Sequence, residues 1–130
     1  MIKYKTVTLN DAHFLFELLK EREKYVNISH VKMPTFKTHC QFILSNPYQE
    51  WNIILADNKE VGSIYIDNRK HAGLFLKKEY QRKGYGREVM QFMIKKYGKV
   101  KVNINPDNLA AHKFLEALGF TVIQNTYELT

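Results

Sequence analysis

The chain has little cysteine and no long apolar run. Cys40 is the one cysteine among 130 residues, so no disulfide forms within the chain, as is usual in a reducing compartment. Its helical spacing from Phe36 and Ile43 predicts a small buried apolar residue rather than a catalytic thiol. No apolar run approaches the roughly 20 residues of a membrane span, and the N-terminus has no signal-peptide pattern. We therefore expect a cytoplasmic protein with no membrane partner.

Repeats, low-complexity segments and linkers are also missing. The three prolines and six glycines do not gather into a segment that would divide the chain, and this length suits one compact domain with a core. The five histidines have no metal-ligand spacing to Cys40 or to carboxylates. The sequence thus predicts a single domain over residues 1–130 and no metal.

The net charge of +7 comes from one stretch of the chain. Residues 69–101 hold eleven basic and two acidic side chains, whereas residues 1–68 hold eight of each. Such a basic cluster is the electrostatic footprint of a nucleic-acid-binding protein. A small ligand with several phosphates needs the same charge over a smaller area, so the charge alone leaves both interpretations open.

The basic stretch contains a glycine loop between a strand pattern and a helix pattern. An apolar run at Leu74 to Leu76 leads into residues 81–86, Gln-Arg-Lys-Gly-Tyr-Gly, and a helical pattern follows at once. Unpaired N–H groups at a helix start, and glycines without a Cβ, let the backbone approach an anion. The loop lacks the Gly-Lys-Ser/Thr ending of nucleotide hydrolases and the third glycine of dinucleotide sites. It predicts a phosphate-bearing ligand of another kind.

Two segments resemble the GNAT superfamily of N-acetyltransferases. Residues 81–86 match Gln/Arg-x-x-Gly-x-Gly/Ala, the acetyl-CoA pyrophosphate loop of that family, and residues 105–120 are similar to its Asn and Leu-Gly-Phe helix segment. The resemblance covers about residues 50–125 well and the first 50 only by topology. It implies acetyl-CoA as co-substrate, and acetyl transfer to the primary amine of a small amine, an amino sugar or a protein N-terminus.

The apolar pattern of the whole chain agrees with the fold of that family. We expect an α/β (α+β) domain whose central mixed, mostly antiparallel sheet is flanked by about four helices, in the order β-α-α-β-β-β-α-β-α-β. Asn10 and Asp11 are expected to cap the first helix and Thr35 the second. The expected helices end near Lys24, Ser45, Lys96 and Leu118, a loop covers 25–34, and the expected strands are 3–9, 51–56, 61–66, 71–77, 99–104 and 120–128.

The resemblance also implies which residues hold the cofactor. In the family fold two neighbouring strands splay apart and expose backbone groups to the pantetheine arm. The main chain of Leu74, Phe75 and Leu76 is expected to pair with this arm, and the Gln81 side chain to line the next turn. Asn108 is expected to cap the last helix, to contact pantetheine, or both. The amides expected to hold the pyrophosphate are those of Arg82, Lys83, Gly84, Tyr85, Gly86 and Arg87; Tyr85 is equally compatible with packing on the loop.

The catalytic groups are less clearly indicated. Amine acetylation needs a base that keeps the amine neutral and a proton for the departing thiolate. Relatives often place a Glu at the strand head and a Tyr in the last helix, where this chain has His71 and Leu115. Because imidazole is a common general base, His71 is the candidate base, with an exposed, non-catalytic histidine as the alternative. Without the Tyr, a nearby tyrosine or solvent must protonate the thiolate.

The acceptor itself is not indicated by a motif. Residues 10–50 are expected to form most of its pocket, with balanced charge, several aromatic rings and the histidines His30 and His39. Two rival functions remain, a catalytically silent CoA-binding module and a basic nucleic-acid-binding adaptor. A monomer and a homodimer are both compatible with the sequence.

Overall fold

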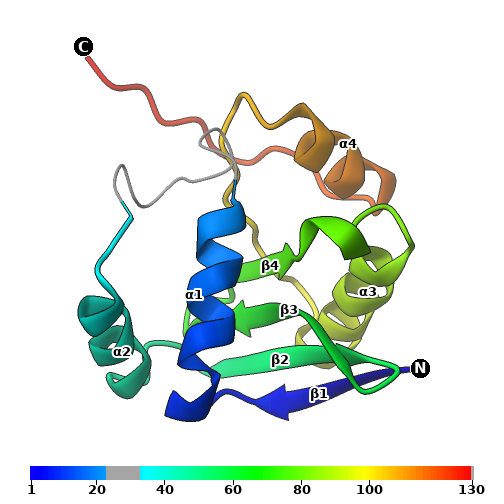
Figure 1. The fold of residues 1–130 in the computed structure, drawn as a ribbon. Helices are drawn as coiled ribbons and strands as arrows, with labels where there is room; N and C mark the ends of the chain where they lie inside the picture. Colours follow the sequence, from blue (N-terminus) through cyan, green and yellow to red (C-terminus); the bar gives the residue numbers. More distant parts are fainter. Residues whose placement is uncertain (23–32, 130) are drawn as a thin grey trace.

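The computed structural model describes residues 1–22 and 33–129, which contain a four-stranded antiparallel sheet with helices on both faces (Figure 1). Its strands are β1 (Ile2–Thr6), β2 (Glu50–Ala56), β3 (Lys59–Ile66) and β4 (Ala72–Leu76), in the spatial order β1-β2-β3-β4. The tight turn expected after β2 is present, since Asp57 and Asn58 have the left-handed φ values of 50° and 66°. The predicted fold class is confirmed.

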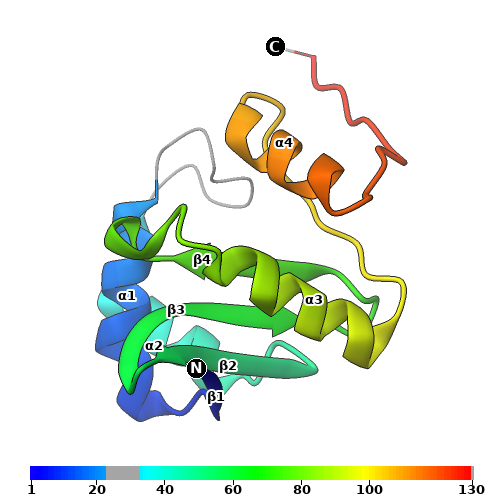
Figure 2. The ribbon, with the colours of Figure 1, turned by 90° about the vertical axis from the view of Figure 1, so that its right-hand side faces the viewer.

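The helices cover both faces of this sheet. The short η1 (Leu9–Asp11) leads into α1 (Ala12–Glu21), which packs with α2 (Phe36–Leu44) on one face, while α3 (Tyr85–Tyr97) covers the other (Figure 2). The short η3 (Lys78–Tyr80) leads out of β4, and α4 (Leu109–Ala117) lies beyond the β4 edge. Among the helices described, none is long and apolar enough to cross a membrane.

Alternating side chains along the strands separate two apolar cores. Ile53 and Ile54 are both fully buried, but Ile53 faces α1 and α2 whereas Ile54 faces α3, because successive strand residues point to opposite faces. Cys40 is half-buried against the first of these cores, in keeping with its expected role as a small apolar residue. The α3 core also contains Ala56, Val61, Ile64, Ile66, Val89, Met90 and Met93.

Side-chain caps determine where the first helices begin. Thr35 caps α2 as predicted, because its Oγ1 accepts from the Thr38 N–H at 3.1 Å. Asp11 is the N-cap of α1 as predicted, but its side chain makes no cap bond there, and Asn10 lies within η1. The Asp11 carboxylate instead accepts from the Thr8 N–H at 2.8 Å, in a capping box that begins η1. Helix α1 ends at Glu21, before the predicted end near Lys24. Residues 25–32 of the predicted loop, with His30, lie outside the described residues.

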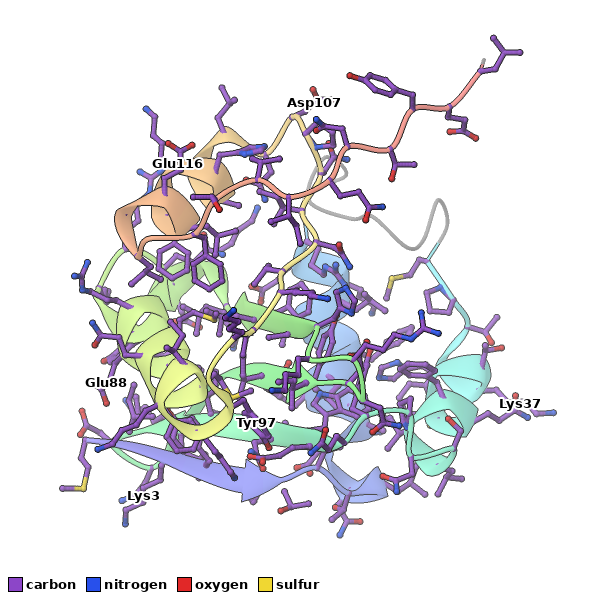
Figure 3. All side chains as sticks on the ribbon, turned by 180° about the vertical axis from the view of Figure 1, so that it is seen from behind. Lys3, Lys37, Glu88, Tyr97, Asp107 and Glu116 are labelled. Atoms are coloured by element: carbon purple, nitrogen blue, oxygen red, sulfur yellow. The ribbon has the colours of Figure 1, made fainter. Side chains whose placement is uncertain are left out.

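The C-terminal end of α3 is tied to β2. Tyr97 lies at this end of α3 (Figure 3), and its hydroxyl donates to Glu50 Oε1. The ammonium of Lys96 donates to the same oxygen at 2.7 Å. Partial burial alone would raise the pKa of Glu50, but these donors and the Asn52 amide outweigh it and lower the pKa. The carboxylate therefore stays charged and helps to fix the direction of α3 across the sheet.

The prediction of two strands after α3 is wrong. Residues 99–104 form only an isolated parallel bridge between Lys101 and His71, and residues 120–128 form no strand. The Ala72 N–H donates to the Lys101 carbonyl at 2.7 Å and the Lys101 N–H to the Lys70 carbonyl at 2.8 Å, and then the pairing stops. None of the described strands lies beside the C-terminal segment (Figure 1). Val122 and Ile123 therefore stay 69% and 75% exposed.

Candidate active site

The outer edge of β4 carries unpaired backbone groups. His71 and Lys77 bond inward to β3, since the His71 carbonyl accepts from Asp67 and the Lys77 N–H donates to Val61, both at 2.9 Å. Inward and outward groups alternate along a strand, so Phe75 also pairs with β3 whereas Leu74 and Leu76 face outward. No described backbone pairs with this edge beyond the bridge at Lys101. Of the three residues expected to meet pantetheine, only Leu74 and Leu76 direct main-chain groups away from β3, to the outer edge of β4.

The glycine loop follows this open edge directly. The Gln81 side chain donates to the Leu76 carbonyl at 3.1 Å, which folds the loop back on the end of β4. Arg82 and Gly84 have positive φ values of 61° and 89°, and a Cβ at Gly84 would meet nothing within 4 Å. Arg82 is thus the only non-glycine residue of this turn in the left-handed conformation, and its side chain is exposed.

The loop ends at the uncapped N-terminus of α3. No side chain caps this helix, and its first backbone bond runs from the Glu88 N–H to the Gly84 carbonyl at 3.2 Å. The preceding amides of Tyr85, Gly86 and Arg87 therefore have no helical partner and carry the positive end of the helix dipole. The side chains of Arg82, Lys83 and Arg87 are exposed around them. This arrangement suits a polyphosphate.

Helix α4 approaches the loop at Gly86. A Cβ on Gly86 would lie 3.4 Å from the Phe114 ring and 3.5 Å from Leu74, so only a small residue keeps this spacing. Asn108 is the N-cap of α4, since its Oδ1 accepts from the Ala111 N–H at 3.2 Å. Leu115 is half-buried, and its carbonyl accepts from the Leu118 and Phe120 N–H groups that end the helix.

His71 stands at the head of β4, beside Asp67. Its Nδ1 lies 3.6 Å from Asp67 Oδ2, and its backbone N–H donates to Asp67 Oδ1 at 2.9 Å. Desolvation alone would raise the pKa of Asp67, but the N–H groups of His71 and Arg69 and their nearby charges lower it. The charged carboxylate orients the imidazole, which is half-buried.

A cavity of about 160 Å³ lies between α1, α2 and the sheet. Phe75 links it to the β4 edge, because its backbone belongs to β4 while its side chain forms one wall of the cavity. The other described lining residues are Leu15, Leu18, Leu19, Arg22, Pro34, Thr38, His39, Phe42, Tyr48, Trp51, Ser63 and Tyr65.

Aromatic rings form the floor of this cavity. Tyr48 stacks on Tyr65 with ring centroids 3.9 Å apart, and burial raises the pKa of both phenols. The Tyr65 ring crosses β4 at Gly73, where a Cβ would lie only 2.2 Å from the ring. Gly73 therefore allows Tyr65 to lie against β4, a role that the sequence pattern did not reveal.

Three buried nitrogen atoms of the cavity have no hydrogen-bond partner among the described residues: Arg22 Nε, His39 Nε2 and Trp51 Nε1. His39 is only 7% exposed, and burial lowers its pKa, so the imidazole is neutral near pH 7. Arg22 lies against Phe75, and burial lowers the pKa of its guanidinium as well. Arg22 was missed by sequence reasoning, although helical spacing from Leu15 and Leu18 could have placed it on the buried side of α1.

The end of α1 is also bonded to the segment that follows β4 and precedes the glycine loop. Glu21 Oε1 accepts from the Lys78 N–H at 3.0 Å, just after β4. The cavity and the glycine loop are thus held next to each other by the same helix end. Within residues 1–22 and 33–129, no group of three His, Cys, Asp or Glu side chains is placed to hold a metal ion.

Comparison with known proteins agrees with this geometry. A domain from Methanocaldococcus jannaschii has a TM-score of 0.82 at 20% identity, over 98% of this chain and 93% of that one. An acetyltransferase from Thermus thermophilus has a TM-score of 0.77 at 17% identity, over 96% and 90%. The yncA protein of Salmonella typhimurium, solved with its cofactor acetyl-CoA, has a TM-score of 0.74 at 15% identity, over 95% and 82%.

Sequence comparison identifies the family. No curated protein sequence matches the chain. A family model, that of the acetyltransferase (GNAT) family, matches residues 13–120. Because this match spans most of the chain and includes both the glycine loop and α4, the protein belongs to the acetyltransferase (GNAT) family.

Proposed function

We propose that the protein transfers the acetyl group of acetyl-CoA to the primary amine of an acceptor by direct attack. The observation that carries this proposal is the open β4 edge at Leu74 leading into the uncapped start of α3. The edge supplies strand-like pairing for the amides of pantetheine, and the helix start supplies N–H groups for the pyrophosphate. Family membership supports acyl transfer.

The cofactor contacts follow from these two features. Leu74 pairs with pantetheine through its outward N–H and carbonyl groups, and Leu76 through its outward N–H, since the Leu76 carbonyl accepts from Gln81. The amides from Arg82 to Arg87 (Arg82, Lys83, Gly84, Tyr85, Gly86 and Arg87) hold the pyrophosphate, with Gln81 closing the turn. Asn108 uses its Oδ1 as a helix cap, which leaves its amide nitrogen to donate to a pantetheine carbonyl.

In the reaction, the amine nitrogen attacks the thioester carbonyl carbon, and the C–S bond breaks as the C–N bond is completed. An outward N–H on β4 polarises the carbonyl oxygen. His71, positioned by Asp67, takes the amine proton through water, because it lies about 10 Å along the strand from Leu74. Solvent or a nearby tyrosine returns a proton to the CoA thiolate, because Leu115 stands where relatives often have a tyrosine. Burial raises the pKa of the Tyr65 phenol and makes it a weaker proton donor, which favours solvent.

The experiment is a melting curve with and without acetyl-CoA, followed by detection of free CoA thiol with a panel of amines. A ligand at about 100 times its Kd stabilises the fold by about 2.7 kcal/mol, so the melting temperature should rise by several degrees. An unchanged melting temperature at millimolar acetyl-CoA would contradict the proposal. A rise without thiol release for any amine would favour a silent CoA-binding module, and salt-dependent binding to DNA or RNA without a rise would favour an adaptor.

We further propose that residues 1–130 form a single domain of a cytoplasmic protein that is either monomeric or homodimeric. The single Cys40, which allows no internal disulfide, supports the location. Light scattering on the purified chain measures the oligomeric state directly.

A further inference from the structure

The cavity between α1, α2 and the sheet combines an apolar wall with unsatisfied hydrogen-bonding groups. Arg22 Nε and Trp51 Nε1 are donors, and His39 Nε2 is a third buried nitrogen without a partner among the described residues. A buried polar atom that lacks a partner costs free energy of about 1–3 kcal/mol, so three of them in one small cavity indicate a missing polar ligand. Two are donors and one of these is cationic, which selects an acceptor with negative charge.

The charges around Arg22 support an anion. The groups that influence its guanidinium are the phenols of Tyr65 and Tyr48, and neither is ionised near neutral pH because burial raises both pKa values. Among the described residues, no carboxylate forms an ion pair with Arg22. A planar guanidinium pairs best with a carboxylate, through two parallel hydrogen bonds.

The size of the cavity limits what accompanies the anion. Its volume is about 160 Å³, and a cavity of about 150 Å³ holds a benzene molecule. Its walls are mostly aliphatic and aromatic, contributed by Leu15, Leu18, Phe42, Trp51 and Phe75. An apolar group up to the size of a benzene ring fits these walls, whereas a sugar ring would place its hydroxyl groups against apolar side chains.

The position of Arg22 decides where the reacting amine lies. Its guanidinium stacks on Phe75, which is a neighbour of Leu74 in the strand that carries the proposed thioester contact. A carboxylate held by Arg22 therefore keeps an amine on the adjacent carbon close to the β4 edge, while an attached apolar group enters the cavity toward Trp51 and His39.

We propose that the acceptor is a small α-amino acid with an apolar side chain, whose carboxylate binds Arg22 and whose side chain fills the cavity. This inference rests on the proposed acetyl transfer for its chemistry, but the binding site stands on its own geometry. The amine attacks the acetyl carbonyl as described above, and the product is the N-acetyl amino acid with free CoA.

Trp51 makes the site directly measurable. It is the one tryptophan of the chain and lines the cavity, so its fluorescence reports occupancy without any turnover. The probes are L-phenylalanine and L-leucine, compared with phenethylamine and isoamylamine, which keep the apolar group and the amine but lack the carboxylate. We expect saturable fluorescence changes with the amino acids and at least tenfold weaker binding of the plain amines, since a charge-assisted hydrogen bond contributes about 1.5–3 kcal/mol.

Two matched variants assign the carboxylate contact. Arg22→Met keeps the length of the side chain and removes its charge, and it should weaken L-phenylalanine binding at least tenfold. Lys20→Met removes an exposed cation from the same helix, where Lys20 pairs with Glu17 outside the cavity, and should bind as the parent does. Both variants should keep the melting-temperature rise with acetyl-CoA, which also shows that they fold.

The outcomes separate this inference from the proposed function. Equal affinity for L-phenylalanine and phenethylamine, or no saturable change with either amino acid, overturns the carboxylate site even if acetyl-CoA raises the melting temperature. Arg22-dependent binding of the amino acids in a protein that acetyl-CoA does not stabilise supports the site and overturns the acetyltransferase proposal. Amino-acid binding together with CoA release supports both.

Discussion

The guanidinium carbon of Arg22 lies 3.9 Å from the centroid of the Phe75 ring. This contact joins the last turn of α1 to the strand whose outer edge carries the unpaired groups of Leu74. A cation over an aromatic ring contributes about 0.5–2 kcal/mol, more when it is removed from water. One pair of residues thus holds the apolar cavity against the edge that leads into the glycine loop.

Gly84→Asp should abolish the stabilisation by acetyl-CoA. The carboxylate would crowd the loop and repel the pyrophosphate where the backbone now has open space. Gly98→Asp is a matched control, because Gly98 also has a positive φ, 75°, with no atom within 4 Å of a Cβ, but it lies at the other end of α3. Gly98 has a ψ of −115°, outside the left-handed helical region that Gly84 occupies with a ψ of −5°, so the control variant should strain the backbone at least as much. Equal loss or equal retention of the acetyl-CoA shift would contradict the assignment of the loop.

His71→Ala should remove the ascending limb of the pH–rate profile and lower kcat by about 10²–10⁴-fold, the usual contribution of a general base. The acetyl-CoA shift should persist, since His71 lies at the opposite end of β4 from the loop. Asp67→Asn should give a smaller loss, because it removes the charge that orients the imidazole. A pH–rate profile for His71→Ala that matches that of the parent protein would show that His71 is not the base.

Gly73→Ala should destabilise the fold by about 1–3 kcal/mol, the usual range for overpacking. The added methyl would lie 2.2 Å from the Tyr65 ring and push it off β4. Urea unfolding measures the change, and the double variant Gly73→Ala/Tyr65→Leu tests its cause. If the clash is real, the two substitutions couple, so that the double variant loses less than the sum of the two single losses. Additive losses would show that Tyr65 does not press on this glycine.

The buried His39 should make stability fall on acidification. Burial lowers the pKa of His39 in the folded protein, whereas the unfolded chain titrates near pH 6.5. Below about pH 6.5 the unfolded chain therefore binds more protons, so the contribution of His39 is complete above that pH and decreases as the pH falls further. His39→Gln should flatten the difference between urea unfolding at about pH 7 and about pH 5.5, whereas His13→Gln at an exposed position should not. A parallel decrease in all three proteins would contradict a buried neutral His39.

Deleting residues 121–130 should change the free energy of unfolding by less than about 0.5 kcal/mol. The side chains of residues 121–129 are exposed and form no strand, so their removal uncovers little. Phe120→Ala in the full chain is the contrasting variant, because Phe120 packs on the α3 core and its loss should cost about 1–3 kcal/mol. A larger loss of stability on deletion would contradict this prediction. If the melting temperature depends on protein concentration in the full chain but not after the deletion, the tail packs on a second copy.

The local parts of the fold could be predicted from the sequence. Thr35 caps its helix, Gly119 adopts the left-handed conformation after α4 with a φ of 94°, and Asn108 caps the same helix. These outcomes depend on hydrogen bonds and backbone preferences within a few residues, which short motifs encode. Asp11 precedes α1 as predicted, but the short η1 before it was not predicted, and Thr8 caps η1 through its reciprocal bonds with Asp11.

The family motifs, the glycine loop and the alternation that builds both sheet faces could be read from the sequence, because they are properties of contiguous residues. The single bridge between 99–104 and β4, the Tyr65 ring across Gly73 and the contact of Arg22 with Phe75 could not. Each of these contacts joins residues from different elements, and each depends on how the helices and strands pack together. Strand pairing and burial at such positions depend on the assembled core, so the propensities of the individual residues do not predict them.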